Sequence, residues 1–296
     1  SLCALDAADG RTLWRCRTGG ELLGGPALAG DTLYAAATDG VLYAVGTDGQ
    51  ERWRYDGGVP FAAPPLCSGD TVVVGSLDGA VHCVDRATGQ ARWRSQAADY
   101  SIETAACALG DVLFIGSWDT FVHALSAADG APRWKARAAG TERPAARYYS
   151  PADCAPAAVG GRVFAADRNY KLTIIDAATG ERVTALAGCA AVAPTADGRG
   201  VYLRRTGGER GLARVDLDGK EVWRSDVPLG YLASPPAEDA GMVAAASDRG
   251  LVSAVSAADG RVLWQYQVPA TSYLPGGAVP AGGVVYAAGL DGFVTA

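Results

Sequence analysis

The stretch Leu5-Asp6-Ala7-Ala8-Asp9-Gly10-Arg11-Thr12-Leu13-Trp14 decides the fold, because versions of it recur along the whole chain. The turn glycine returns as Gly49, Gly89, Gly130, Gly180, Gly219 and Gly260. Four residues after each glycine stand Trp14, Trp53, Trp93, Trp134, Thr184, Trp223 and Trp264. The glycines are 39, 40, 41, 50, 39 and 41 residues apart, a period that is typical of propellers and other repeat arrays.

Each repeat contains four short apolar segments separated by Gly or Asp turns, without a helical period. In the first repeat we expect strands over 26–29, 32–36, 41–45 and 52–55. Similar quartets cover 62–95, 103–136, 152–186, 190–225 and 232–267. This pattern predicts an all-β chain of four-stranded antiparallel blades, a β-propeller. One large aromatic per repeat, always in the same slot, suits a wedge buried between neighbouring blades.

The two ends of the chain each carry part of a further blade. Residues 276–289 read as a first and second strand, and residues 1–17 read as a third and fourth. Joined, they predict a seven-bladed propeller over 1–296, a single domain whose ring is closed by both termini, with no exposed edge strand. The segment 293–296 repeats the slot of 2–5, so an eight-bladed propeller truncated at both ends is the alternative.

Composition excludes several classes of partner. The 296 residues have a net charge of −6 and no basic patch, which argues against nucleic acid. No apolar run is long enough for direct membrane insertion, and we expect a monomeric domain. The seven cysteines (3, 16, 67, 83, 107, 154 and 189) show no Cys-x-x-Cys spacing and are expected to be buried residues rather than metal ligands. A disulfide between Cys154 and Cys189 is left open.

The residues that break the repeat are the candidates for function. Trp118 and Asp119 lie in Ser117-Trp118-Asp119-Thr120, where the preceding repeat reads Ser-Leu-Asp-Gly. The tryptophan is outside the wedge slot, so we predict that it faces a ligand or partner rather than packing within its own loop. Tyr100 and Glu103 precede a first strand and are predicted to belong to the same mouth.

A second group follows the longest spacing between glycines, where an insertion spans 141–150. Here and in the loop 167–171, arginines and tyrosines gather on an acidic protein. Because arginine binds anions bidentately and stacks on planar groups, the cluster predicts a site for a small anionic ligand or an acidic protein or peptide. The alternative is a loop that caps a channel with its tyrosines folded inward. The predicted residues are Arg143, Arg147, Tyr148, Tyr149, Arg168 and Tyr170.

The repeat resembles that of the pyrroloquinoline-quinone-like (PQQ-like) propellers, as Val81–Trp93 and Val122–Trp134 illustrate. The resemblance covers essentially the whole chain and implies three functions. The first is a non-catalytic sensor or regulatory propeller attached to a bacterial Ser/Thr protein kinase. The second is a scaffold of the outer-membrane barrel-assembly type. The third is a quinone-dependent dehydrogenase.

The sequence favours the first of these readings. The dehydrogenases of this family are longer and carry an adjacent cysteine pair and a calcium site, and no Cys-Cys occurs here. We therefore expect no enzymatic activity, no PQQ or other cofactor, and no metal. The two histidines, His82 and His123, occupy equivalent strand slots, which indicates scaffold positions rather than ligands. Because the chain begins within a repeat, we expect it to be part of a larger bacterial protein, on a side of the membrane that the sequence does not decide.

Overall fold

The computed structural model describes residues 1–141, 146–207, 210–230, 234–269, 274, 276–290 and 293–296. The chain divides into two compact units, Ser1–Lys135 and Ala136–Ala296. Apart from the short 3₁₀ helices η1 (Ala139–Thr141) and η2 (Ala146–Tyr149), the regular structure of the described residues is β-strand. Within them no helix has the length and hydrophobicity needed to cross a bilayer.

The first unit begins with a two-stranded sheet, which is followed by three sheets of four strands each. The strands are β1 (Leu2–Leu5), β2 (Thr12–Cys16), β3 (Ala27–Ala29), β4 (Thr32–Ala36), β5 (Val41–Gly46), β6 (Glu51–Asp56), β7 (Leu66–Ser68), β8 (Thr71–Gly75), β9 (Ala80–Asp85), β10 (Ala91–Gln96), β11 (Cys107–Leu109), β12 (Val112–Gly116), β13 (Phe121–Ser126) and β14 (Pro132–Arg137).

The second unit has three more four-stranded sheets and ends in one of three strands. Its strands are β15 (Ala157–Val159), β16 (Arg162–Ala166), β17 (Lys171–Asp176), β18 (Arg182–Ala187), β19 (Cys189–Pro194), β20 (Gly200–Arg205), β21 (Gly211–Asp216), β22 (Glu221–Ser225), β23 (Ala237–Asp239), β24 (Met242–Ala246), β25 (Leu251–Ser256), β26 (Val262–Gln267), β27 (Ala278–Ala281), β28 (Val284–Ala288) and β29 (Val294–Thr295).

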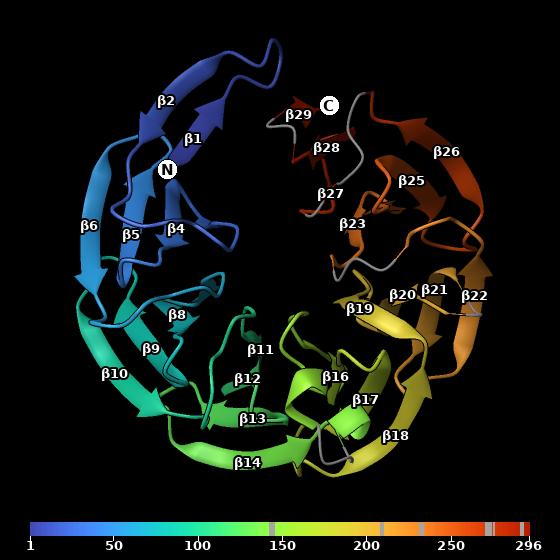
Figure 1. Ribbon diagram of the computed structural model, residues 1–296, viewed down its shortest axis with the longest axis horizontal. Helices are drawn as coiled ribbons and strands as arrows, with labels where there is room; N and C mark the ends of the chain where they lie inside the picture. Colours follow the sequence, from blue (N-terminus) through green and yellow to red (C-terminus); the bar gives the residue numbers. More distant parts are fainter. Residues whose placement is uncertain (142–145, 208–209, 231–233, 270–273, 275, 291–292) are drawn as a thin grey trace. The chain divides into compact units, whose positions relative to one another are not determined.

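The strands of each sheet pair in sequence order and antiparallel, as in β3-β4-β5-β6, where Tyr34 lies opposite Ala44 and Ala44 opposite Trp53. In Figure 1 the fourth strands β6 and β10 form one border of the first unit, and the second strands β4 and β8 lie on the opposite side. These sheets are the blades of an all-β, seven-bladed β-propeller of four-stranded antiparallel blades, which confirms the predicted fold class. Six blades are complete within the described residues.

The two terminal sheets hold the strands expected of a shared blade. β27 and β28 are first and second strands, while β1 and β2 are a third and a fourth. β29 takes the third slot a second time, as the repeat of 2–5 by 293–296 indicates. That the two sheets join and close the ring remains a prediction.

Four wedge tryptophans, Trp14, Trp53, Trp93 and Trp223, pack on the turn glycine of the following sheet. The Trp93 indole Nε1 donates a hydrogen bond to the carbonyl oxygen of Ala127 at 3.1 Å, and a Cβ added to Gly130 would lie 2.6 Å from the Trp93 ring. Gly49 meets Trp14, Gly89 meets Trp53 and Gly260 meets Trp223 in the same way. The glycine and the tryptophan therefore recur together because they form one contact between blades.

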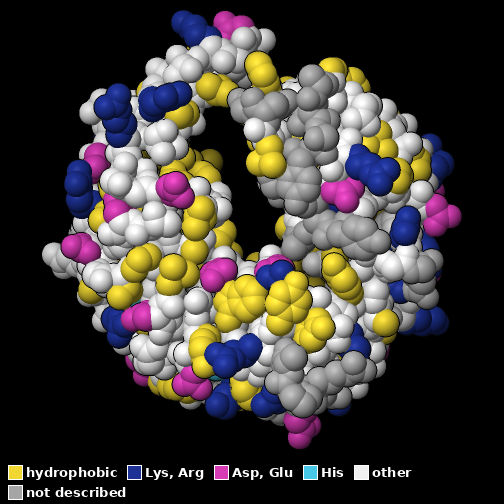
Figure 2. Space-filling model, viewed as in Figure 1, with side chains coloured by type: hydrophobic (Ala, Val, Ile, Leu, Met, Phe, Trp, Pro, Cys, Tyr) yellow, Lys and Arg dark blue, Asp and Glu magenta, His cyan; other side chains and the backbone are white. Residues whose placement is uncertain are grey.

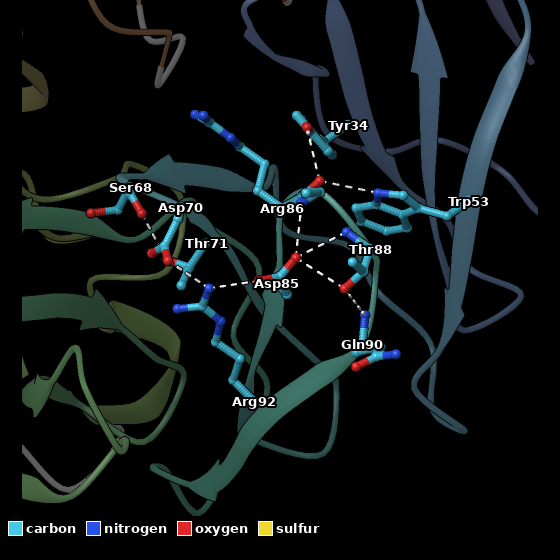
Figure 3. Close-up of polar contacts among 11 residues, drawn as sticks. Tyr34, Trp53, Ser68, Asp70, Thr71, Asp85, Arg86, Thr88, Gln90 and Arg92 are labelled. Carbon is cyan, nitrogen blue, oxygen red and sulfur yellow. Dashed lines mark hydrogen bonds and ion pairs between the residues drawn. The ribbon is translucent and has the colours of Figure 1, made fainter.

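Figure 3 shows this contact between the first two complete blades. The carbonyl oxygen of Arg86 accepts hydrogen bonds from Trp53 Nε1 at 3.1 Å and from the Tyr34 hydroxyl at 3.3 Å. In the same turn, Asp85 Oδ1 accepts from the backbone nitrogens of Ala87 and Thr88 at 3.0 and 2.9 Å. The aspartate and glycine of this turn are structural, as the sequence predicts.

The hydrophobic core lies between successive blades rather than within one sheet. One cluster joins Tyr34, Leu42 and Phe61 to Val72 and Val84 of the next blade. Similar clusters follow in both units. Within each unit, these clusters hold neighbouring blades together through side chains from both.

Candidate functional site

The predicted site residues fall in both units. Tyr100, Glu103, Trp118 and Asp119 belong to the first unit. Arg147, Tyr148, Tyr149, Arg168 and Tyr170 belong to the second. Arg143 lies outside the described residues. Within their own unit the members of each group come from neighbouring loops, but the role of all of them in binding remains a prediction.

In the first unit the Asp119 carboxylate is occupied by the protein itself. Its Oδ1 accepts from the backbone nitrogen of Phe121 at 3.0 Å, and its Oδ2 lies 2.8 Å from His123 Nε2 and 3.3 Å from the Asp99 nitrogen. Both side chains of the Asp119–His123 pair are buried. The hydrogen bond from His123 helps to lower the pKa of Asp119, against the burial that would raise it. The pair therefore ties the loop around Asp99 to β13.

The other predicted residues of this unit lie in the two loops that the Asp99–Asp119 hydrogen bond joins. Tyr100 is exposed, Glu103 and Trp118 are half-buried, and the Trp118 backbone nitrogen donates to the Ser101 carbonyl at 3.1 Å. Thr120 has φ +82°, a left-handed conformation that glycine adopts at the same turn position in Gly40 and Gly79. A residue other than glycine costs roughly 1–2 kcal/mol there.

The second unit brings four of the predicted residues and one further residue into a single cluster. Tyr148 lies in η2, within the inserted loop, and its ring packs edge-on against the Tyr149 ring with the two centroids 5.4 Å apart. The Arg168 guanidinium lies over the Tyr148 ring, 4.7 Å from its centroid. The same guanidinium forms an ion pair with Asp153, with Nε 3.2 Å from Oδ2 and Nη1 3.3 Å from Oδ1.

A cavity of about 160 Å³ opens beside this cluster. The polar and aromatic side chains that line it are those of Tyr148, Asp153, Asp167, Arg168 and Tyr170. Tyr148 is 61% exposed and Tyr170 39%, so the aromatic walls are open to solvent. Figure 2 shows hydrophobic, basic and acidic side chains intermixed on one face of the molecule.

Asp167 forms the buried base of the cavity. Its Oδ1 accepts from the backbone nitrogens of Asn169 and Lys171 at 2.9 and 3.1 Å, and its Oδ2 accepts from that of Gly140 at 2.8 Å. Burial nevertheless raises the pKa of the carboxyl group. The pKa of Asp153 is also raised by burial, although Arg168 acts in the opposite direction.

Tyr170 occupies the turn in a left-handed conformation, with φ +56°. The equivalent residue is Gly40, Gly79 or Gly250 in other blades, each with positive φ. The aromatic side chain is thus retained at a backbone position that favours glycine, which points to a use for it beyond the fold.

Sequence reasoning missed Asp153, although a signal was present. Asp153 lies four residues before β15, the first strand of its blade, and Glu103 lies four residues before β11, the first strand of the preceding blade. Glu103 is a candidate because of its place before a first strand, and Asp153 occupies the equivalent position one blade later.

Two further expectations concern the cysteines and histidines. All seven cysteines are free thiols, so Cys154 and Cys189 do not form a disulfide, and burial raises the pKa of Cys154 to about 11. The expectation of burial holds for Cys83, Cys154 and Cys189 and is wrong for the others: Cys16, Cys67 and Cys107 are half-buried and Cys3 is exposed. His82 Nδ1 lies 3.0 Å from the Tyr55 hydroxyl, and His123 pairs with Asp119. Both histidines are therefore built into the blades. No group of three potential metal-ligating side chains occurs within the described parts of the chain.

Four-stranded blades, linked by a tryptophan that packs on the next turn glycine, define the chain as a β-propeller of PQQ-like repeats. The family model described as outer membrane protein assembly factor BamB matches residues 1–216 and 208–296. The chain belongs to this family.

Two solved structures share the fold. The crystal structure of BamB from Moraxella catarrhalis has a TM-score of 0.73 and 18% identity, covering 93% of this chain and 87% of the other. The computationally designed Ika8 protein has a TM-score of 0.81 and 17% identity, covering 99% and 88%. None of the curated proteins matches the sequence. At these identities the likeness concerns the fold alone.

Proposed function

We propose that this chain is a non-catalytic, protein-binding propeller that acts as an assembly scaffold. The observation that carries the proposal is the cluster of Tyr148, Arg168 and Tyr170 around a cavity of about 160 Å³. Tyrosine and arginine, together with tryptophan, are the residue types that supply most binding energy in protein interfaces. The cavity is smaller than the roughly 300–1,000 Å³ of small-molecule sites, and its size suits one side chain of a partner.

Membership of a family described as an outer membrane assembly factor supports a scaffold role. The attachment to a Ser/Thr kinase, which the repeat resemblance also implies, stays a prediction. The absence of catalysis and of a quinone cofactor is part of the proposal. The use of both histidines in hydrogen bonds of the scaffold supports the absence of catalysis.

Tyr170→Gly provides the sharpest test, because it removes the aromatic ring and places at this turn the residue that other blades use. The purified chain would capture proteins from a bacterial extract, and a captured protein would then be purified and titrated directly. We expect Tyr170→Gly and Tyr148→Ala each to weaken binding about tenfold, which corresponds to about 1.4 kcal/mol. The melting temperature of Tyr170→Gly should not fall.

Tyr266→Ala is the matched control, since Tyr266 is a tyrosine of similar exposure (49%) on the outer strand β26. It should leave the affinity unchanged. Equal affinity of all four proteins for the captured partner would remove the cluster from the interface.

A further inference from the structure

Among the residues that the structure describes, acidic side chains outnumber basic ones in the lining of the cavity beside Tyr148, although the sequence pattern predicted an anion site. Asp153 and Asp167 line it together with one arginine, Arg168. The Arg168 guanidinium is held by Asp153 along one edge and by the Tyr148 ring across one face. An incoming anion would have to compete with Asp153 for this guanidinium.

The two carboxylates retain capacity for a further donor. Each carboxylate oxygen offers about two lone-pair sites. The Asp153 oxygens each contact Arg168, and the side chain remains 39% exposed. Asp167 Oδ2 accepts from the Gly140 nitrogen. A donor that enters the cavity can therefore reach an acceptor without breaking the Arg168–Asp153 pair.

The electrostatic environment of these two groups differs from that of the other aspartates. Where an arginine forms the main contact, as Arg92 does with Asp70 and Arg133 with Asp111, the pKa of the carboxyl group is lowered. Among the described carboxyl groups, those with a raised pKa are Asp153 and Asp167, and both line this cavity. Lys171 partly offsets the effect at Asp167. A positive charge placed beside either carboxylate would favour its ionised form.

Resting on the proposed function, we propose that this cavity receives a cationic side chain, arginine or lysine, from the protein partner. Asp153 accepts the charged donor, and the exposed rings of Tyr148 and Tyr170 flank its aliphatic stem. The cavity of about 160 Å³ accommodates a single such side chain. The ion pair with Arg168, which lies over the Tyr148 ring, then holds the Asp153 carboxylate in place for the incoming donor.

Three short peptides test the charge of the occupant: acetyl-Gly-Arg-Gly-amide, its citrulline analogue, which is isosteric but neutral, and acetyl-Gly-Glu-Gly-amide. Each would be titrated into the whole chain while the amide resonances of residues around the cavity are followed by NMR. We expect the arginine peptide to shift the Asp153 and Tyr170 resonances. The other two peptides should bind at least about tenfold more weakly.

Variants of Asp153 show whether the cavity binds a cationic or an anionic side chain. Asp153→Asn should weaken the arginine peptide about tenfold and Asp153→Glu should restore it. The control Asp111→Asn removes the same charge from another arginine–aspartate pair, at an exposed site (76%) in the first unit, and should leave binding unchanged. Stronger binding of the glutamate peptide, especially if Asp153→Asn improves it by releasing Arg168, would overturn the proposal. Equal shifts by the arginine and citrulline peptides, or no shifts at all, would do the same.

The captured partner distinguishes a failure of this inference from a failure of the proposed function. If Tyr148→Ala weakens the partner while Asp153→Asn leaves its affinity unchanged, the protein-binding function stands and the cation pocket does not. If neither variant changes the affinity, the cluster is not the interface.

Discussion

The contact between a wedge tryptophan and the next turn glycine can be tested by adding one methyl group. In Gly130→Ala the new Cβ would lie 2.6 Å from Trp93 Cε3 and 2.8 Å from Cζ3. Carbon atoms prefer a separation of about 3.5–4.0 Å, so the indole must move. Movement weakens its hydrogen bond to the Ala127 carbonyl.

The expected cost has two parts. Gly130 has φ +72°, and alanine in a left-handed conformation costs roughly 1–2 kcal/mol, of which about 0.4–1 kcal/mol is offset by the lower entropy of the unfolded chain. Overpacking adds about 1–3 kcal/mol, and the weakened hydrogen bond adds up to about 1 kcal/mol. We expect Gly130→Ala to lower the free energy of unfolding by about 3 kcal/mol.

Two glycines of similar backbone conformation provide controls. Gly10 occupies the same turn slot with φ +73°, and Gly110 lies in a first-to-second hairpin with φ +61°; neither has an atom within 4 Å of an added Cβ. Alanine at either position should cost about 1 kcal/mol or less, the backbone part alone. Urea unfolding followed by circular dichroism gives the three values.

A double-mutant cycle then assigns the extra cost to the ring. Trp93→Thr copies the blade in which Thr184 stands in the wedge slot. On that background Gly130→Ala should lose about 2 kcal/mol of its effect. If Gly130→Ala costs no more than Gly10→Ala and Gly110→Ala, or if the cycle shows no coupling, the contact with the tryptophan ring is not the reason why glycine recurs at this turn.

Two other predictions concern the blades. Burial, with a smaller effect of Arg94, lowers the pKa of His82 from 6.5 to about 4. The neutral His82 side chain therefore makes its full contribution to stability above the unfolded pKa, and this contribution is lost as the pH falls from 6.5 towards 4. Lowering the pH to about 5 should cost the native protein about 2 kcal/mol more than His82→Gln. Parallel denaturation midpoints of the native protein and His82→Gln across this pH range would contradict the prediction. Trp93→Ala should cost about 3–5 kcal/mol and Trp118→Ala clearly less, because Trp118 lies outside the wedge slot; equal losses by thermal denaturation would show that Trp118 is also a structural wedge.

The sequence alone determined the blades of this protein. The period of the turn glycine and the tryptophan predicted four strands per repeat, and the structure has them at Ala27–Ala29, Thr32–Ala36, Val41–Gly46 and Glu51–Asp56 in the first complete blade. This was possible because turn chemistry and alternation are local, and each is set by a few neighbouring residues. The sequence also pointed to the two blades that depart from the repeat, through the loops at 117–120 and 167–171.

Only the tertiary structure decided how the charges in those loops are used. Arg168 and Asp153 are separated by fifteen residues, and their pairing depends on how two loops fold over β15 and β16. Asp119 looked available in the sequence, but its carboxylate is buried against His123.

Arg204 illustrates the same limit. It stands in a strand slot that holds Ala246 in the following blade, and it is 1% exposed. Its guanidinium Nη1 donates to the Ala246 carbonyl at 2.8 Å and to the Ser234 hydroxyl at 3.1 Å. The local pattern predicts where a strand lies, whereas the burial and partners of a charge depend on side chains that other blades bring to it.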